Sequence, residues 1–153
     1  MIPDYLIQKA IISKLQSDTG IITVLSGTNS TIAQIREEQY FGDNFVYPAI
    51  RVHVLDNPPE GNGIDRIKLS RVSFSVSCYS EEPSSFECSK LNSKVIDALF
   101  DKQVINGTDE NNNPYFNLIR IDYESGNNAF RLDNRIWFAL SIFSGTLHKL
   151  VSP

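Results

Sequence analysis

The chain has 153 residues, of which 41% are hydrophobic. This is enough for a single domain, residues 1–153, with a hydrophobic core. Its formal net charge of −4 argues against binding to DNA or to an anionic membrane through bulk electrostatics. No stretch approaches the roughly 18 apolar residues of a membrane helix. The N-terminal MIPDYLIQKA lacks the basic and apolar regions of a secretory signal, so we expect a protein made in the cytoplasm.

The first segment, IPDYLIQKAIISKLQS, has apolar residues at helical spacing, and Pro3 and Asp4 suit its first turn. The apolar residues are Ile7, Ala10, Ile11 and Leu15. Asp18 or Thr19 then caps a short second helix over GIITVL, which Gly27 would end. A short strand is expected around TIAQIRE, residues 31–37.

Two strands follow. In YPAIRVHVL, residues 47–55, apolar side chains alternate with Arg51 and His53. In KLSRVSFSVSCYS, residues 68–80, apolar side chains alternate with serines. The apolar set is Val72, Phe74, Val76 and Cys78, and the serine set is Ser73, Ser75 and Ser77. The connecting DNPPEGNGID is too long for a tight hairpin turn, so we expect it to project from the sheet.

A helix is predicted within residues 81–102, where Ser84 and Glu87 have the spacing of a capping box. Its apolar stripe comprises Cys88, Leu91, Val95, Ala98 and Leu99. Cys78 and Cys88 are the only cysteines, and we interpret them as buried thiols in a reducing compartment. A disulfide between them is the less favoured alternative.

The asparagine-rich NGTDENNNP, residues 106–114, is predicted to be a loop. Two strands are expected after it, over residues 115–123 and 131–147, joined by ESGNNAF. The resulting class is α+β. A mainly antiparallel sheet of four to five strands carries two main helices, in the order α-(α)-β-β-β-α-β-β.

The last strand suggests a use for the serine face. One parity should face the core, and it consists of Leu132, Ile136, Phe138, Leu140 and Ile142. The other parity includes Trp137 and Phe143, which we place beside the serines on the second face of the sheet. Either the N-terminal helix covers this face, or it is a subunit interface.

Residues suited to catalysis are sparse. His53 and His148 have no Cys, Asp or Glu at metal-ligand spacing. Asp122 and Asp133 alternate with arginines, a pattern that cross-strand ion pairs explain. Phosphate-binding and nucleophile-elbow motifs are missing. An RNA-binding sheet would present aromatic rings where this chain has hydroxyls. We therefore expect no enzyme activity, no metal and no cofactor.

The arrangement resembles the tail-terminator, or tail-completion, proteins of long-tailed bacteriophages. The resemblance runs from the first helix to FSGTL. It is carried by LIQKAIISKLQSDTGIITVLSG, by the YPAIRVHVL strand, by RVSFSVSCYSEEPSSFECSKLNSKVIDALF and by the closing RLDNRIWFALSIFSG. The asparagine-rich insertion at 106–114 is longer than the family minimum.

The resemblance implies a non-enzymatic virion protein without a cofactor. It implies a ring of six copies on the tail tube, which ends tube polymerisation and joins the tail to the neck or connector protein. DNA passes through the central hole without specific binding, and the protein is assembled in the host cytoplasm. An adjacent head–tail connector or neck protein is the alternative within this class. A cellular small-ligand-binding or hydrolytic α+β domain is the alternative outside it.

A ring needs a contact between two different patches of one chain. The candidate interface residues are Ser73, Ser75, Ser77, Trp137 and Phe143. Two loops are candidates for axial contacts with the neck and the tube. They contribute Asp56, Asn57, Pro58, Pro59 and Glu60 from the first loop, and Asn111, Asn112 and Asn113 from the second. These assignments follow from the expected geometry of the strands and loops.

Overall fold

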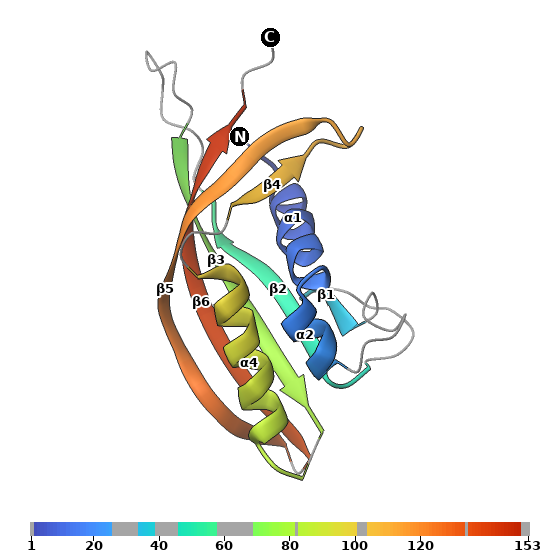
Figure 1. The fold of residues 1–153 in the computed structure, drawn as a ribbon. Coiled ribbons are helices and arrows are strands. Elements are labelled where there is room, and N and C mark those ends of the chain that lie inside the picture. The colour runs from blue at the N-terminus through green and yellow to red at the C-terminus, as the bar shows by residue number, and fades with distance from the viewer. Residues whose placement is uncertain are drawn as a thin grey trace.

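The computed structural model describes residues 2–25, 34–38, 46–57, 69–81, 83–100, 104–133 and 135–150. Within them the chain forms the elements labelled in Figure 1. The helices are α1 (Asp4–Gln16), α2 (Thr19–Val24) and α4 (Phe86–Leu99). The strands are β1 (Ile35–Glu37), β2 (Ala49–Asp56), β3 (Leu69–Ser80), β4 (Ile105–Thr108), β5 (Pro114–Asp133) and β6 (Ile136–Lys149).

The strands form one mixed sheet in the order β1-β2-β3-β6-β5-β4. β1 pairs with β2 in parallel, and every other neighbouring pair in this sheet is antiparallel. The α+β class is therefore as predicted, and the described residues provide six strands where four to five were expected. The additional strand is β4, and β5 curls across the sheet to reach it (Figure 1).

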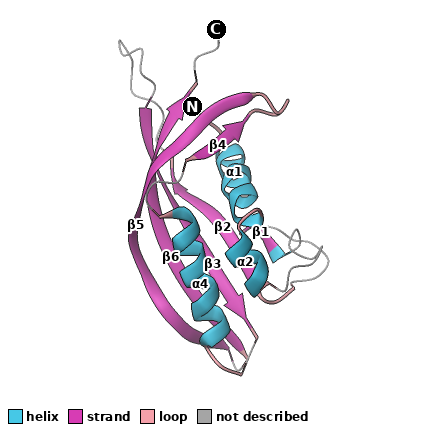
Figure 2. Cartoon of the chain, viewed as in Figure 1, coloured by secondary structure: helices cyan, strands magenta, loops and turns pink. Residues whose placement is uncertain are grey.

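The described helices α1, α2 and α4 lie on the same side of the sheet (Figure 2). The predicted apolar stripes of α1 and α4 are buried there, which confirms both helical assignments. They pack against the apolar parity of β2 and β3, in which Ile50, Val52, Phe74 and Val76 are fully buried. Burial of these side chains between helices and sheet supplies the main stabilisation of the fold.

The predicted helix starts are only partly correct. Asp18 caps α2 as expected, because its Oδ1 accepts a hydrogen bond from the Ile21 amide at 3.0 Å. α2 ends at Val24, and Gly27 lies outside the described residues. α4 has no capping box: its N-cap is Ser85, and Glu87 accepts a hydrogen bond from the Ser80 hydroxyl at 2.8 Å. The Glu87 carboxylate therefore bonds to Ser80 of β3, where a capping box would have it bond to the backbone at the start of its own helix.

Cys78 and Cys88 are buried free thiols, as the favoured interpretation stated. The Cys88 thiol donates to the Cys78 carbonyl oxygen at 3.5 Å. Burial, together with the charge of Glu87, raises the pKa of Cys88 to about 11. Burial also raises the pKa of Cys78 well above its usual value. Both side chains therefore stay protonated and act as small apolar groups at neutral pH.

The segment expected to be a loop at 106–114 is mostly a hairpin. β4 ends at Thr108, and Asp109 organises the turn by accepting hydrogen bonds from the Asn111 and Asn113 amides, each at 2.9 Å. The amide of Asn113 is the main reason why the pKa of Asp109 is lowered. The loop prediction was wrong for residues 106–108 because Asn106 and Gly107 are common turn residues. Here Gly107 lies opposite the ring of Phe116, where only a glycine fits.

ESGNNAF, predicted to connect two strands, lies inside the continuous strand β5. The pairing of β5 with β6 has four irregularities, and these accommodate the curl of the strand. Gly126 is required by close approach, since a Cβ there would lie 2.5 Å from the Leu140 carbonyl oxygen. The chain instead reverses between Asp133 and Ile136, within the segment that was predicted to be one strand.

Changing Gly107 to Ala should lower the free energy of unfolding by about 2 kcal/mol, because overpacking a closed core forces side chains off their preferred positions. A Cβ at Gly107 would lie 2.0 Å from the Cζ atom of Phe116, and Phe116 is fully buried. The measurement is denaturant unfolding. Asn106→Ala, at the exposed neighbouring position, is the control and should change stability little. Equal effects of the two substitutions would contradict the packing argument.

Changing Arg120 to Gly should raise the free energy of unfolding by about 1 kcal/mol. Arg120 has a φ of 53° at an irregularity of β5, a left-handed conformation that a side chain with a Cβ disfavours. Asn112 has a φ of 62° in the hairpin turn, where asparagine is well tolerated. Asn112→Gly is thus the matched control and should gain much less in thermal or denaturant unfolding. A loss of stability in Arg120→Gly would refute the assignment of strain.

Candidate functional site: the open face of the sheet

The register of β3 with β6 decides which side chains face away from the helices. Ser75 pairs with Ile142, Ser77 with Leu140, and Tyr79 with Phe138. Side chains directly opposite one another in an antiparallel pair share a face. The serine face of β3 is therefore joined to the apolar parity of β6. We call this side, away from α1, α2 and α4, the open face (Figure 1).

This arrangement reverses the predicted orientation of β6. Phe143 pairs with Phe74 and stacks on it with ring centroids 5.4 Å apart, fully buried beneath the helices. Trp137 pairs with Ser80 and packs partly buried against the same core. The prediction that Trp137 and Phe143 share a face with Ser73, Ser75 and Ser77 was wrong.

The residues predicted to face the core from this strand also need correction. Phe138, Leu140 and Ile142 are half-buried on the open face, and Leu132 is 56% exposed. Ile136 is likewise half-buried. The error has a simple cause: both parities of β6 contain large apolar residues, so alternation alone could not choose between them. The alternative in which the N-terminal helix covers the serine face is also wrong, because α1 lies on the opposite side (Figure 2).

The open face is hollowed at its centre. The hollow measures about 510 Å³, and it is lined by Glu38, His53, Leu55, Ser75, Ser77, Phe138, Leu140 and Ile142. Short hydroxyl side chains form part of this lining beside the longer apolar ones, which explains the depression. Ser75 and Ser77 are themselves buried by their neighbours, whereas Leu55 is 48% exposed. The serine face is thus a mixed surface, apolar in most of its larger side chains.

A row of aromatic rings crosses the open face beside the hollow. Phe138 lies between Tyr79, at a centroid distance of 5.1 Å, and Phe130, at 5.3 Å. Phe130 is exposed and comes from β5, within the segment that was predicted to be a connection. The place of Phe130 could not be predicted from local pattern, because the irregular register of β5 with β6 sets its partner. Exposed aromatic area of this kind commonly marks an interaction surface.

Further along the open face is a polar cluster. Arg71 Nη2 donates to Ser144 Oγ at 2.7 Å and lies 3.2 Å from Glu124 Oε1. The Ser144 hydroxyl also donates to Glu124. The cluster joins β3, β5 and β6, and the Arg71 and Glu124 side chains remain substantially exposed to solvent. It therefore borders the apolar hollow with a charged, hydrated edge, as at the rim of many interfaces.

His53 and Glu38 are the titratable groups of the hollow. Their closest atoms, Nδ1 and Oε2, are 3.9 Å apart, and Nδ1 has no hydrogen-bond partner. At that separation the two side chains are in ion-pair range without a hydrogen bond between them. Within the described part of the chain, no three His, Cys, Asp or Glu residues come together as a metal site.

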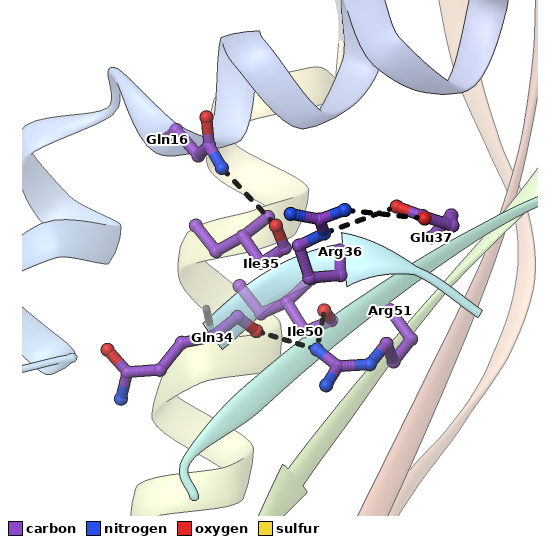
Figure 3. A network of polar contacts seen from close by, with 7 residues as sticks. All are labelled: Gln16, Gln34, Ile35, Arg36, Glu37, Ile50 and Arg51. Atoms are coloured by element: carbon purple, nitrogen blue, oxygen red, sulfur yellow. Dashed lines mark hydrogen bonds and ion pairs between the residues drawn. The ribbon is translucent and has the colours of Figure 1, made fainter. Parts of the chain in front are cut away.

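Glu38 directly follows the short strand β1 and lines the hollow. Polar contacts hold β1 in place (Figure 3). Arg51 Nη1 donates to the carbonyl oxygens of Gln34 and Ile50, each at 3.0 Å. On the other side of β1, the Gln16 side-chain amide donates to the Ile35 carbonyl oxygen at 3.3 Å. Arg51 is only 3% exposed, so its guanidinium ties β1 to β2 from inside the protein.

The residues proposed for axial contacts have different fates. Asp56 is exposed at the end of β2, but the Asn57 side chain donates to Ile2 O and Asp4 Oδ1, each at 2.8 Å, and is thereby held against the start of α1. Pro58, Pro59 and Glu60 lie outside the described residues. Asn111, Asn112 and Asn113 form the exposed turn between β4 and β5. Their contact role stays a prediction.

Comparison with known proteins supports the fold. No protein family and no curated protein matches the sequence. Among solved structures, a chain of the virion of a native gene transfer agent particle has a similar fold, with a TM-score of 0.66 at 12% sequence identity. The match covers 94% of this chain and 96% of that chain. Among the described residues, no helix is long and apolar enough to cross a membrane.

Changing Arg51 to Met should lower the free energy of unfolding by about 2 kcal/mol, because the buried Gln34 carbonyl would lose its charged donor. The control is Arg71→Met, the same substitution at the exposed Arg71–Glu124 ion pair. That exposed pair should contribute less than about 1 kcal/mol. Denaturant unfolding of both variants tests the assignment. An Arg51→Met protein as stable as Arg71→Met would mean that the guanidinium of Arg51 does not hold β1.

Proposed function

We propose that the chain is a structural virion protein that acts by packing against other proteins and catalyses no reaction. In this proposal it forms a ring at the head-proximal end of a phage tail tube, ends tube polymerisation and joins the tail to the neck. Copies of the chain are its first partners, and the tube and neck proteins are the others.

The observation that carries the proposal is the fold shared with a chain of a gene transfer agent virion, because it spans nearly the full length of both chains. Near-complete coverage means that the shared structure is the whole domain. The likeness supports a phage-like structural role, and the resemblance of the sequence to tail-terminator proteins supports the position at the end of the tail.

The open face supports the same proposal on physical grounds. Its hollow and aromatic row present apolar side chains on a side of the sheet that no described helix covers. A domain gains stability by covering such a face, and partner chains are the means available to a packing protein. The net charge of −4 suits a ring through which DNA must pass without adhering.

The test is to add the purified chain to a tail tube protein from the same genome while the tubes polymerise. Electron microscopy should show shorter tubes, each with a ring at one end, and native mass spectrometry should give the copy number of the ring. The tube protein alone is the control. Binding to the neck protein without an effect on tube length would favour the neighbouring neck position. A chain that binds neither tubes nor neck protein would overturn the proposal.

A further inference from the structure

The hollow of the open face is suited to receive a large apolar side chain. Leu55, Phe138, Leu140 and Ile142 provide apolar contacts, and Ser75 and Ser77 are short enough to leave space between them. The hollow is about 510 Å³ and remains open to solvent within the described part of the chain. An aromatic anchor filling a pocket of this kind is a common centre of a protein interface.

The same chain offers a matching protrusion. Phe86 is the first residue of α4, and its side chain is 80% exposed, more than any other large hydrophobic residue of the described chain. Tyr5, also exposed, is held by its hydrogen bond to Glu110. Burial of this exposed ring against a partner would remove apolar surface from water and so stabilise a complex.

Charge complements shape in this pair of surfaces. Lys90 lies four residues after Phe86 and hence on the same stripe of α4. It is exposed, and no carboxylate within the described residues forms an ion pair with it. Glu38 lines the hollow, its side chain is 45% exposed, and its Oε2 atom lies 3.9 Å from Nδ1 of the His53 imidazole. A helix start seated in the hollow therefore brings an ammonium group to a carboxylate.

We propose that the first turns of α4 in one copy dock into the open-face hollow of the next copy, with Phe86 as the anchor and Lys90 paired with Glu38. The proposal rests on the ring assembly proposed above and specifies its contact. α4 lies on one side of the sheet (Figure 1), whereas the side chains that line the hollow belong to the other side. The contact joins two different patches, so it propagates from copy to copy and closes when the rotation permits.

Site-directed cross-linking tests the contact directly. One preparation carries Ser89→Cys, exposed on α4 three residues after Phe86, and a second carries His53→Cys, in the lining of the hollow. Both are otherwise full-length and keep Phe86, Lys90, Glu38 and Leu140. The native thiols are buried and have raised pKa values, so they should react slowly. Under mild oxidation the mixture should form covalent dimers far faster than either preparation alone. A chain carrying both substitutions should give a ladder of oligomers. A mixture that forms no more dimer than the separate preparations would overturn the proposal.

Charge reversal provides a second test that does not depend on new cysteines. Lys90→Glu and Glu38→Lys should each weaken self-association about fivefold, as expected for an interfacial ion pair near the rim. The double variant should restore it, because every contact then has the pair reversed. Phe86→Ala should weaken association about thirtyfold if it is a central anchor. Phe100→Ala, exposed at the other end of α4, is the control and should have no effect.

Analytical ultracentrifugation measures these constants, and circular dichroism confirms that each variant is folded. The contact would be refuted if the double variant did not regain wild-type self-association and Phe86→Ala associated as strongly as wild type. Tube capping separates the two proposals. If the wild-type chain caps tubes but the cysteine variants form no cross-link, the proposed function stands and this interface is refuted. If the cysteine variants form cross-linked oligomers but the chain does not bind tubes, the interface stands and the proposed function is refuted.

Discussion

The register between β3 and β6 is the constraint on which the rest of the structure depends. Phe74 opposite Phe143 places two stacked rings in the core, and the next pair along, Ser75 opposite Ile142, must then lie on the other side. A slip of one residue would exchange the two sets and would expose Phe74, Val76 and Cys78 to water. Full burial of these side chains makes that slip costly. The composition of the open face is therefore a consequence of core packing as much as of interface chemistry.

The sequence pattern correctly predicted the helices and strands whose apolar residues lie on one side only. The α1 and α4 stripes and the alternation of β2 and β3 were correct because each has one clearly apolar side. The face of β6 was wrong because apolar residues occupy both of its parities. β4 and the middle of β5 were missed because Gly107 and Gly126 look like turn residues, although each is a glycine for the sake of a distant neighbour. Such requirements exist only in the folded chain.

The candidate site divides in the same way. The serines of β3 were correctly singled out as a distinctive face, but their apolar companions Leu140, Ile142 and Phe130 could be found only from strand pairing. Glu38 reaches the hollow through a three-residue parallel strand whose position depends on the buried guanidinium of Arg51. The two titratable groups of the hollow, His53 and Glu38, lie 3.9 Å apart, and most of the larger side chains around them are apolar.

The Gln16 amide on the Ile35 carbonyl has a consequence for solubility. An edge strand with unpaired backbone groups can pair with a strand of another molecule, which is the first step toward amyloid-like aggregates. Here β1 is three residues long, and a side chain from α1 already occupies one of its backbone acceptors. Proteins that gather at high local density are especially exposed to that hazard. The edge at β1 is therefore less available for strand pairing than the open face is for side-chain contacts. Contacts between side chains depend on complementary shape, so they permit a limited number of partners.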